Sequence, residues 1–223
     1  MTRAPGAIPV VFLGGPGVEY AERPPPAALA PWVAATWTVR AMRRFDLRIL
    51  PDGCVDLIGD EVVGPFTSAI VARVEAGEEA HGIRLRPGAF PALFGVPADE
   101  LVDARIPLAD LGRRPARSRT RLAELAAAAP PPDPLAEAAM RTIPAVLARE
   151  SGYSERHLRR RLLASAGLGP KRLQRIGRMQ LALRAGRGES WARTAVEHGW
   201  YDEAHMANDV RALAGATPHA LLG

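Results

Sequence analysis

The chain has 223 residues, of which 48% are hydrophobic and 24% charged, enough for one large globular domain or two small ones. Its single cysteine excludes an intrachain disulfide and any zinc site built from several cysteines. No apolar run approaches the roughly 20 residues that cross a bilayer, so we expect a cytoplasmic protein without membrane contact.

The positive charge is concentrated in the last third of the chain. Residues 1–140 carry 15 Arg and 17 acidic residues, a net charge of −2. Residues 141–223 carry 13 Arg, one Lys and 7 acidic residues, a net charge of +7. An Arg-rich genome accounts for Arg over Lys but not for this asymmetry, which favours a sensing or assembling part joined to a part that binds a polyanion.

Short strands dominate the first part of the chain. Gly and Pro near the beginning predict an edge strand around Val10–Leu13, followed by an extended arm. Alternating or β-branched segments predict strands at Trp32–Arg40, Phe45–Ile49, Val55–Ile58, Ala69–Val74 and Ile83–Leu85. A rigid turn at Arg86–Pro91 and short helices at Ala98–Val102 and Leu108–Leu111 follow. The pattern indicates a small barrel-like β domain.

A proline run marks the domain boundary. Arg117–Ala129 is Ala-rich and helical in pattern, and Pro130, Pro131 and Pro132 end it because prolines cannot continue a helix. We therefore predict an α+β chain with a β-rich domain at 1–115, a linker at 116–133 and an all-α domain at 134–223. The predicted helices of the last part are Pro134–Met140, Ile143–Ser151, Ser154–Ala166, Pro170–Ala185, Ser190–His198 and Asp202–Ala214.

The all-α part contains a helix-turn-helix pattern. Ala148 is small enough for two helices to cross, and Gly152 lies four residues later, where a turn needs a positive φ. Ser154 is suited to cap the next helix. That helix places Leu158 and Leu162 on its back and arginines on its front, which suits a helix in the major groove of DNA.

The same pattern recurs about 48 residues later. Ala195, Gly199 and the capping residue Asp202 repeat the small residue, the turn and the cap. Both units end in Gly-x-x-Pro, at Gly167–Pro170 and at Gly215–Pro218. One extra residue lies in the second turn. A doubled unit with matched positions is a far more specific signal than a single unit.

These residues together resemble the DNA-binding domain of the AraC/XylS family of bacterial transcription regulators, over about 142–222. The runs Leu50–Leu57, Val63–Pro65 and Gly82–Ala89 also resemble a poorly characterised sensor-like domain that precedes this module in some relatives. The resemblance implies two helix-turn-helix units joined by a long helix, with both recognition helices in successive major grooves. It also implies an amino-terminal domain that binds a small-molecule effector, forms a homodimer, or both, and a contact with RNA polymerase.

The resemblance also assigns candidate DNA-binding residues. Its base-facing positions correspond to Arg156, Arg159 and Arg160 in the first unit, and to Glu203, Ala204 and Asn208 in the second. We add His205, Arg161, Arg172 and Arg175 as contacts to base or phosphate, although position 161 is often apolar in the family. Arg178 is expected to bridge the two units. The family usually has Arg at position 208, where this chain has Asn. The second unit is therefore expected to be the weaker reader, meaning that it recognises the DNA sequence through fewer direct contacts.

Two further sets of residues have competing interpretations. Trp32, Trp37, Arg84 and Arg86 are candidates for an effector site, with Arg84 and Arg86 on one face of a strand. Cys54 is expected to be a buried, inert thiol rather than a redox sensor. The carboxylates Asp52, Asp56, Asp60 and Glu61 are most simply explained by turns and solvent-facing positions.

The sequence therefore predicts a sequence-specific regulator that binds double-stranded DNA. We find no phosphate-binding loop, metal-spaced cluster or nucleophile elbow, and we expect no cofactor, metal or catalytic residue. Two alternatives remain open: an amino-terminal domain that only dimerises, and a small-molecule enzyme whose helical half binds a partner.

Overall fold

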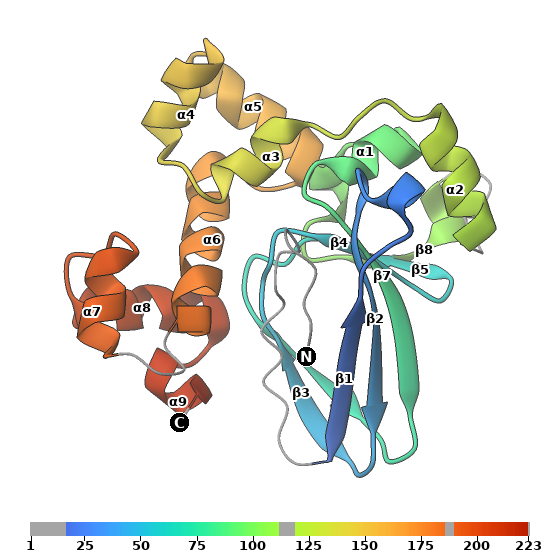
Figure 1. The fold of residues 1–223 in the computed structure, drawn as a ribbon, viewed down its shortest axis with the longest axis horizontal. Helices are drawn as coiled ribbons and strands as arrows, with labels where there is room; N and C mark the ends of the chain where they lie inside the picture. The colour runs from blue at the N-terminus through green and yellow to red at the C-terminus, as the bar shows by residue number, and fades with distance from the viewer. Residues whose placement is uncertain (1–16, 112–118, 186–189, 223) are drawn as a thin grey trace.

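The computed structural model describes residues 17–111, 119–185 and 190–222, which form a β-rich domain followed by a helical one. In Figure 1 the helical domain lies along one side of the β-rich domain, with its two ends joined by one long helix. The predicted α+β fold class is confirmed.

The β-rich domain is built from two antiparallel sheets. The larger has six strands in the order β1-β2-β7-β4-β5-β8: β1 (Val18–Arg23), β2 (Val33–Ala41), β7 (Glu79–Leu85), β4 (Val55–Ile58), β5 (Glu61–Val63) and β8 (Arg105–Pro107). The smaller pairs β3 (Phe45–Ile49) with β6 (Ile70–Val74). Within the described residues both sheets are open, with β1 and β8 at the edges of the larger one.

Short helices complete the core of this domain. They are α1 (Ala89–Phe94), α2 (Arg119–Ala128) and the 3-10 turns Ala27–Leu29, Ala98–Leu101 and Leu108–Leu111. Phe90 and Phe94 of α1 stack on each other and pack with Leu122 and Ala126 of α2. The indole Nε1 of Trp32 donates to the carbonyl of Pro130 at 3.0 Å, which fastens the proline run to the domain.

Seven helices form the rest of the described chain: α3 (Pro134–Ala139), α4 (Pro144–Ser151), α5 (Glu155–Ala166), α6 (Pro170–Ala185), α7 (Trp191–Glu197), α8 (Glu203–Ala214) and α9 (Pro218–Leu222). Figure 1 shows α6 running from the pair α4 and α5 at one end to the pair α7 and α8 at the other. The bounds of α3 to α8 agree with the prediction within one residue at each end.

Two predictions for the secondary structure of the β-rich domain are wrong, and the strands β5 and β8 are additional to the predicted ones. β1 pairs along its whole length with β2, so 18–23 is an edge strand and not part of an extended arm. The proline-flanked turn at Arg86–Pro91 continues into α1, because Gly88 begins the helix with a φ of 84° and Pro91 is tolerated in the first turn. The strand predicted at Val10–Leu13 lies outside the described residues.

The β-rich domain contacts both halves of the helical domain. At the first half, the 3-10 turn Ala98–Leu101 and α1 pack against α5. On α6, Arg172 donates to the carbonyl of Thr67 at 2.9 Å. At the second half, the backbone N–H of Ala69 donates to the carbonyl of Leu213 on α8 at 2.6 Å. These contacts hold the helical domain at both ends and along its connecting helix.

Candidate nucleic-acid interface

The first helix-turn-helix unit consists of α4 and α5. Gly152 has the positive φ expected of the turn, 72°, and the N–H of Tyr153 donates back to Ala148 at 3.0 Å. The Ser154 hydroxyl accepts from the N–H of His157 at 3.2 Å, so Ser154 is the predicted cap of α5. Ala148 is 4% exposed at the helix crossing, as its small size predicts.

The second unit, α7 and α8, repeats this geometry. Gly199 has a φ of 81°, and the N–H of Trp200 donates to Ala195 at 2.9 Å. The carboxylate of Asp202 caps α8 by accepting from His205 N–H at 2.7 Å. The second helix of each unit, α5 or α8, has 12 residues and ends at a glycine with left-handed backbone angles. Each position of α5 therefore corresponds to the position 48 residues later in α8.

The outer face of α5 is strongly basic. Arg156, Arg159 and Arg160 are all exposed, whereas Leu158 and Leu162 on the opposite face are fully buried. Among the described residues, the three guanidinium groups have no hydrogen-bond or ion-pair partner. The structure therefore leaves their donors free for base edges or phosphates.

The outer face of α8 is different in chemistry. Glu203, Ala204, His205 and Asn208 are exposed, and their contact with DNA stays a prediction. The Asn208 side-chain oxygen accepts from Arg211 Nη1 at 3.1 Å. The exposed face of α5 carries three arginines, whereas that of α8 carries one acid and small or polar groups. The two faces therefore differ in charge.

The other predicted arginines make intramolecular contacts. Arg172 donates to Thr67 across the domain interface, and Arg161 donates both Nε and Nη2 to the carboxylate of Asp133, at 2.8 and 3.1 Å. Arg175 Nε donates to Asp209 at 2.6 Å, from a side chain that is 35% exposed. These residues are partly buried, so the structure brings only Arg156, Arg159 and Arg160 together as an exposed basic group.

Asp209 is a buried carboxylate at the centre of a hydrogen-bond network, which the sequence analysis missed. Its carboxylate accepts from Arg175, from Arg178 Nη2 at 2.9 Å and from Trp200 Nε1 at 3.0 Å. Burial on its own raises the pKa of Asp209, but the hydrogen bonds from Trp200 and the two arginines outweigh it and lower the pKa. Arg178 joins the connecting helix α6 to Asp209 and to the Gly199 carbonyl, both of which belong to the second unit. Its expected bridging of the two units stays a prediction.

Tyr201 is a second residue to which the sequence analysis gave no functional role. It is the extra residue of the second turn, between the buried Trp200 and the cap Asp202. Its side chain is 88% exposed beside the beginning of α8. The one-residue difference between the two turns was the signal that could have identified it.

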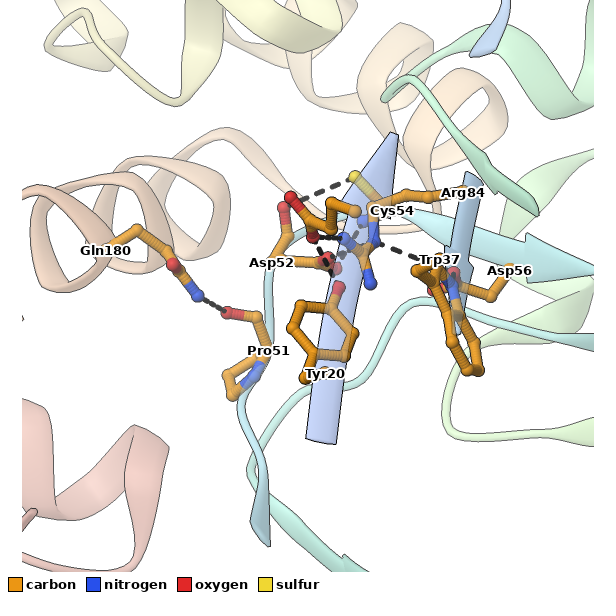
Figure 2. Close-up of polar contacts among 9 residues, drawn as sticks. Tyr20, Trp37, Pro51, Asp52, Cys54, Asp56, Arg84 and Gln180 are labelled. Atoms are coloured by element: carbon orange, nitrogen blue, oxygen red, sulfur yellow. Dashed lines mark hydrogen bonds and ion pairs between the residues drawn. The ribbon is translucent and has the colours of Figure 1, made fainter. Parts of the chain in front are cut away.

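The four candidate effector-binding residues do not face a common site. Trp37 and Arg84 meet Asp56 in a buried cluster, whereas Trp32 and Arg86 point to the domain boundary. Trp37 Nε1 donates to Asp56 at 2.5 Å, and Arg86 Nη1 donates to Glu137 of α3 at 2.9 Å. In Figure 2, Arg84 lies between Asp52 and Asp56, with the Tyr20 ring beside them.

Three carboxylates surround the guanidinium of Arg84, which is 2% exposed. Nη1 pairs with Glu22 at 2.7 Å, and Nε lies 3.1 Å from Asp52 and 3.6 Å from Asp56. The prediction of solvent-facing turns is therefore wrong for Asp52 and Asp56, because long-range pairing with Arg84 draws them inside. Burial raises the pKa of Asp52 to about 6 and also raises that of Asp56, although Arg84 opposes both shifts.

The cluster adjoins the helical domain through the segment that contains Asp52. Pro51 accepts a hydrogen bond from Gln180 Nε2 of α6 at 2.8 Å (Figure 2). Cys54 is 2% exposed, and burial raises the pKa of its thiol well above the usual value. The expectation of a buried thiol is confirmed. Within the described residues, no group of three or more His, Cys, Asp or Glu side chains could hold a metal ion.

The fold and the doubled turn define a helix-turn-helix protein. Residues 147–223 match the family model of a helix-turn-helix domain, and residues 21–107 match a domain of unknown function, DUF6597. The carboxy-terminal part is thus an AraC-type helix-turn-helix domain, of the class found in DNA-binding transcription regulators.

Other comparisons add little to this assignment. A crystal structure of apo ToxT K231A from Vibrio cholerae strain SCE256 is similar over 92% of this chain and 96% of that chain, with 11% identity and a TM-score of 0.40. A search of curated proteins found no match. None of the helices in the described part of the chain is long and apolar enough to cross a membrane.

Proposed function

We propose that the chain is a sequence-specific transcription regulator in which α5 and α8 enter successive major grooves of double-stranded DNA. The observation that carries the proposal is the exposed group Arg156, Arg159 and Arg160, on a helix whose opposite face is buried in a helix-turn-helix unit. Arg donors suit guanine O6 and N7 and also phosphate oxygens. The first unit is thus the main reader of sequence.

The second unit docks in the next groove with weaker direct readout. Its face offers Glu203, Ala204, His205 and Asn208, which provide few charge-assisted hydrogen bonds to bases. Specificity in that half comes in part from the shape and deformability of the DNA. Arg172 and Arg175 belong to the proposal as phosphate contacts only if DNA displaces their present partners, the Thr67 carbonyl and Asp209.

Tyr201 adds a phosphate contact to the second unit. Tyr hydroxyls and the N–H groups at helix beginnings are common phosphate ligands in DNA complexes. An 88% exposed tyrosine next to the beginning of α8 can supply such a contact where α8 lacks arginine. A Tyr201→Phe variant should then bind all duplexes somewhat more weakly without a change in sequence preference.

The amino-terminal domain regulates or assembles this module in our proposal. The resemblance to AraC/XylS regulators supports a small-molecule effector, homodimerisation, contact with RNA polymerase and a cytoplasmic location. An effector site made of Trp32, Trp37, Arg84 and Arg86 is not favoured, because these side chains face two different regions. Assembly through this domain is therefore the simpler form of the proposal. The described part of the predicted linker 116–133 is not a free connection, because Leu122 and Ala126 of α2 pack in the core of the β-rich domain and Pro130 accepts from Trp32.

Salt dependence of DNA binding tests the proposed function. The logarithm of the affinity for a random-sequence duplex of about 40 base pairs is measured against the logarithm of the salt concentration. The double variant Arg159→Ala with Arg160→Ala should flatten the slope by about one to two units, if each residue contacts one phosphate. Arg141→Ala, which removes an exposed arginine outside both units, is the matched control. An unchanged slope and affinity in the double variant would refute the proposal.

A further inference from the structure

Arg161 lies on α5 but its donors point into the protein. Its Nε and Nη2 form a two-bond contact with the carboxylate of Asp133, at 2.8 and 3.1 Å. Its Nη1 donates to the Tyr153 hydroxyl at 2.6 Å, and its guanidinium carbon lies 5.3 Å from the Tyr153 ring centroid. A paired arginine–carboxylate contact of this kind fixes orientation as well as distance.

Asp133 is itself fixed by the amino-terminal domain. Its carboxylate caps α3 by accepting from Leu135 N–H at 3.1 Å, and its own N–H donates to the Gly88 carbonyl at 3.4 Å. A side chain at Gly88 would lie 2.8 Å from the Asp133 carbonyl oxygen, so only glycine permits this approach. Arg86 reinforces the contact through Glu137 of α3.

The equivalent position of the second unit has the opposite charge and a different partner. Asp209 corresponds to Arg161 through the 48-residue repeat, and each bonds the aromatic residue of its own turn, Trp200 or Tyr153. Asp209 is held by α6, the helix between the two units. Arg161 is held instead by Asp133 at the domain boundary. The two recognition helices are therefore anchored to different parts of the molecule.

We propose that Asp133 and Arg161 form a positioning pair, through which the amino-terminal domain sets the orientation of α5 on DNA. The pair does not touch DNA itself. It acts through Arg156, Arg159 and Arg160, which lie on the outer face of the same helix. This inference rests on the proposed DNA-binding function and adds to it a physical connection between the two domains.

The test compares sequence discrimination with stability. The duplex is the tightest binder that the wild-type full chain selects from a random-sequence pool, and discrimination is its affinity relative to that for unselected duplex. Arg161→Met and Asp133→Asn are each expected to reduce this ratio about fivefold to tenfold, since Asn still caps α3. The combined variant should lose no more than either alone, because both remove one interaction. The Arg161 side chain is 37% exposed and that of Asp133 only 11%, so the thermal stability of each variant is measured beside the ratio.

Two further variants separate the loss of the positioning pair from the general effect of removing an ion pair and from poor folding. Glu61→Gln removes an exposed ion pair with Arg105 on the β-rich domain and should leave the ratio unchanged. Arg161→Lys keeps the charge but loses the two-bond geometry, so its ratio should lie between those of wild type and Arg161→Met even if the methionine variant folds poorly.

Single variants that keep the ratio within twofold of wild type would overturn the positioning pair, as would losses that multiply in the combined variant. A wild-type chain that shows neither discrimination nor salt-dependent DNA binding would instead overturn the proposed function. The two failures are therefore distinguishable.

Discussion

Replacing Asp52 by Asn should stabilise the protein at neutral pH, although it removes a partner of a buried arginine. Asp52 is 7% exposed, and burial raises its pKa from 3.8 to about 6 against the opposing charge of Arg84. A carboxylate whose pKa is higher in the folded state binds protons more readily there. Its ionisation therefore costs stability as the pH rises from about 4 to about 6.

The size of the effect follows from the pKa shift. The difference between 3.8 and about 6 corresponds to about 3 kcal/mol at pH 7.5 and shrinks to about 1 kcal/mol at pH 4.5. Asn resembles the protonated carboxyl and can still accept the hydrogen bond that Cys54 N–H donates to Asp52 at 2.9 Å. Arg84 keeps Glu22 and Asp56 as partners.

Urea unfolding of wild type and Asp52→Asn at pH 4.5 and pH 7.5 measures this difference. Asp46→Asn is the matched control, because its ion pair with Arg73 is largely exposed and should contribute less than about 1 kcal/mol at either pH. If Asp52→Asn is less stable than wild type at pH 7.5, the attraction to Arg84 outweighs the burial of the carboxylate and the reasoning is wrong.

Three other predictions concern the helical domain and its contact with the sheet. Asp209→Ala should lower the free energy of unfolding by about 3 kcal/mol, since it leaves two arginines and an indole without their acceptor; an effect below 1 kcal/mol in urea unfolding would contradict this. Gly177→Ala should lower the melting temperature by several degrees, because the added carbon would lie 1.9 Å from the Met140 carbonyl oxygen; an unchanged melting temperature would show that α3 and α6 separate easily. Cys54 should react with a thiol reagent at pH 8 only on unfolding, and rapid reaction of the folded chain would refute its burial.

Local signals account for what the sequence predicted well. The turn glycines Gly152 and Gly199 and the caps Ser154 and Asp202 each depend on a few neighbouring residues, and the structure places them as predicted. The same holds for β3 and β4, whose bounds the alternating pattern predicted without error.

Contacts between distant segments account for what the sequence could not reveal. The acids that pair with Arg84 come from β1, β4 and the segment between β3 and β4. Arg161 and Asp133 are 28 residues apart, and Arg161 was assigned to DNA because a basic side chain on a recognition helix gives no sign of an internal partner. β1 was missed because its pairing with β2, rather than its own composition, makes it a strand.

Selection of bound duplexes from a random-sequence pool, followed by footprinting of the selected sites, tests the central claim most directly. The account predicts two contacted segments about one helical turn, or roughly 10 base pairs, apart on one face of the DNA. One segment should be strongly specified in sequence, and Arg159→Ala with Arg160→Ala should abolish that specification. The other should be weakly specified. Enrichment of no sequence, or of two equally specified segments, would contradict the account of one strong and one weak reader.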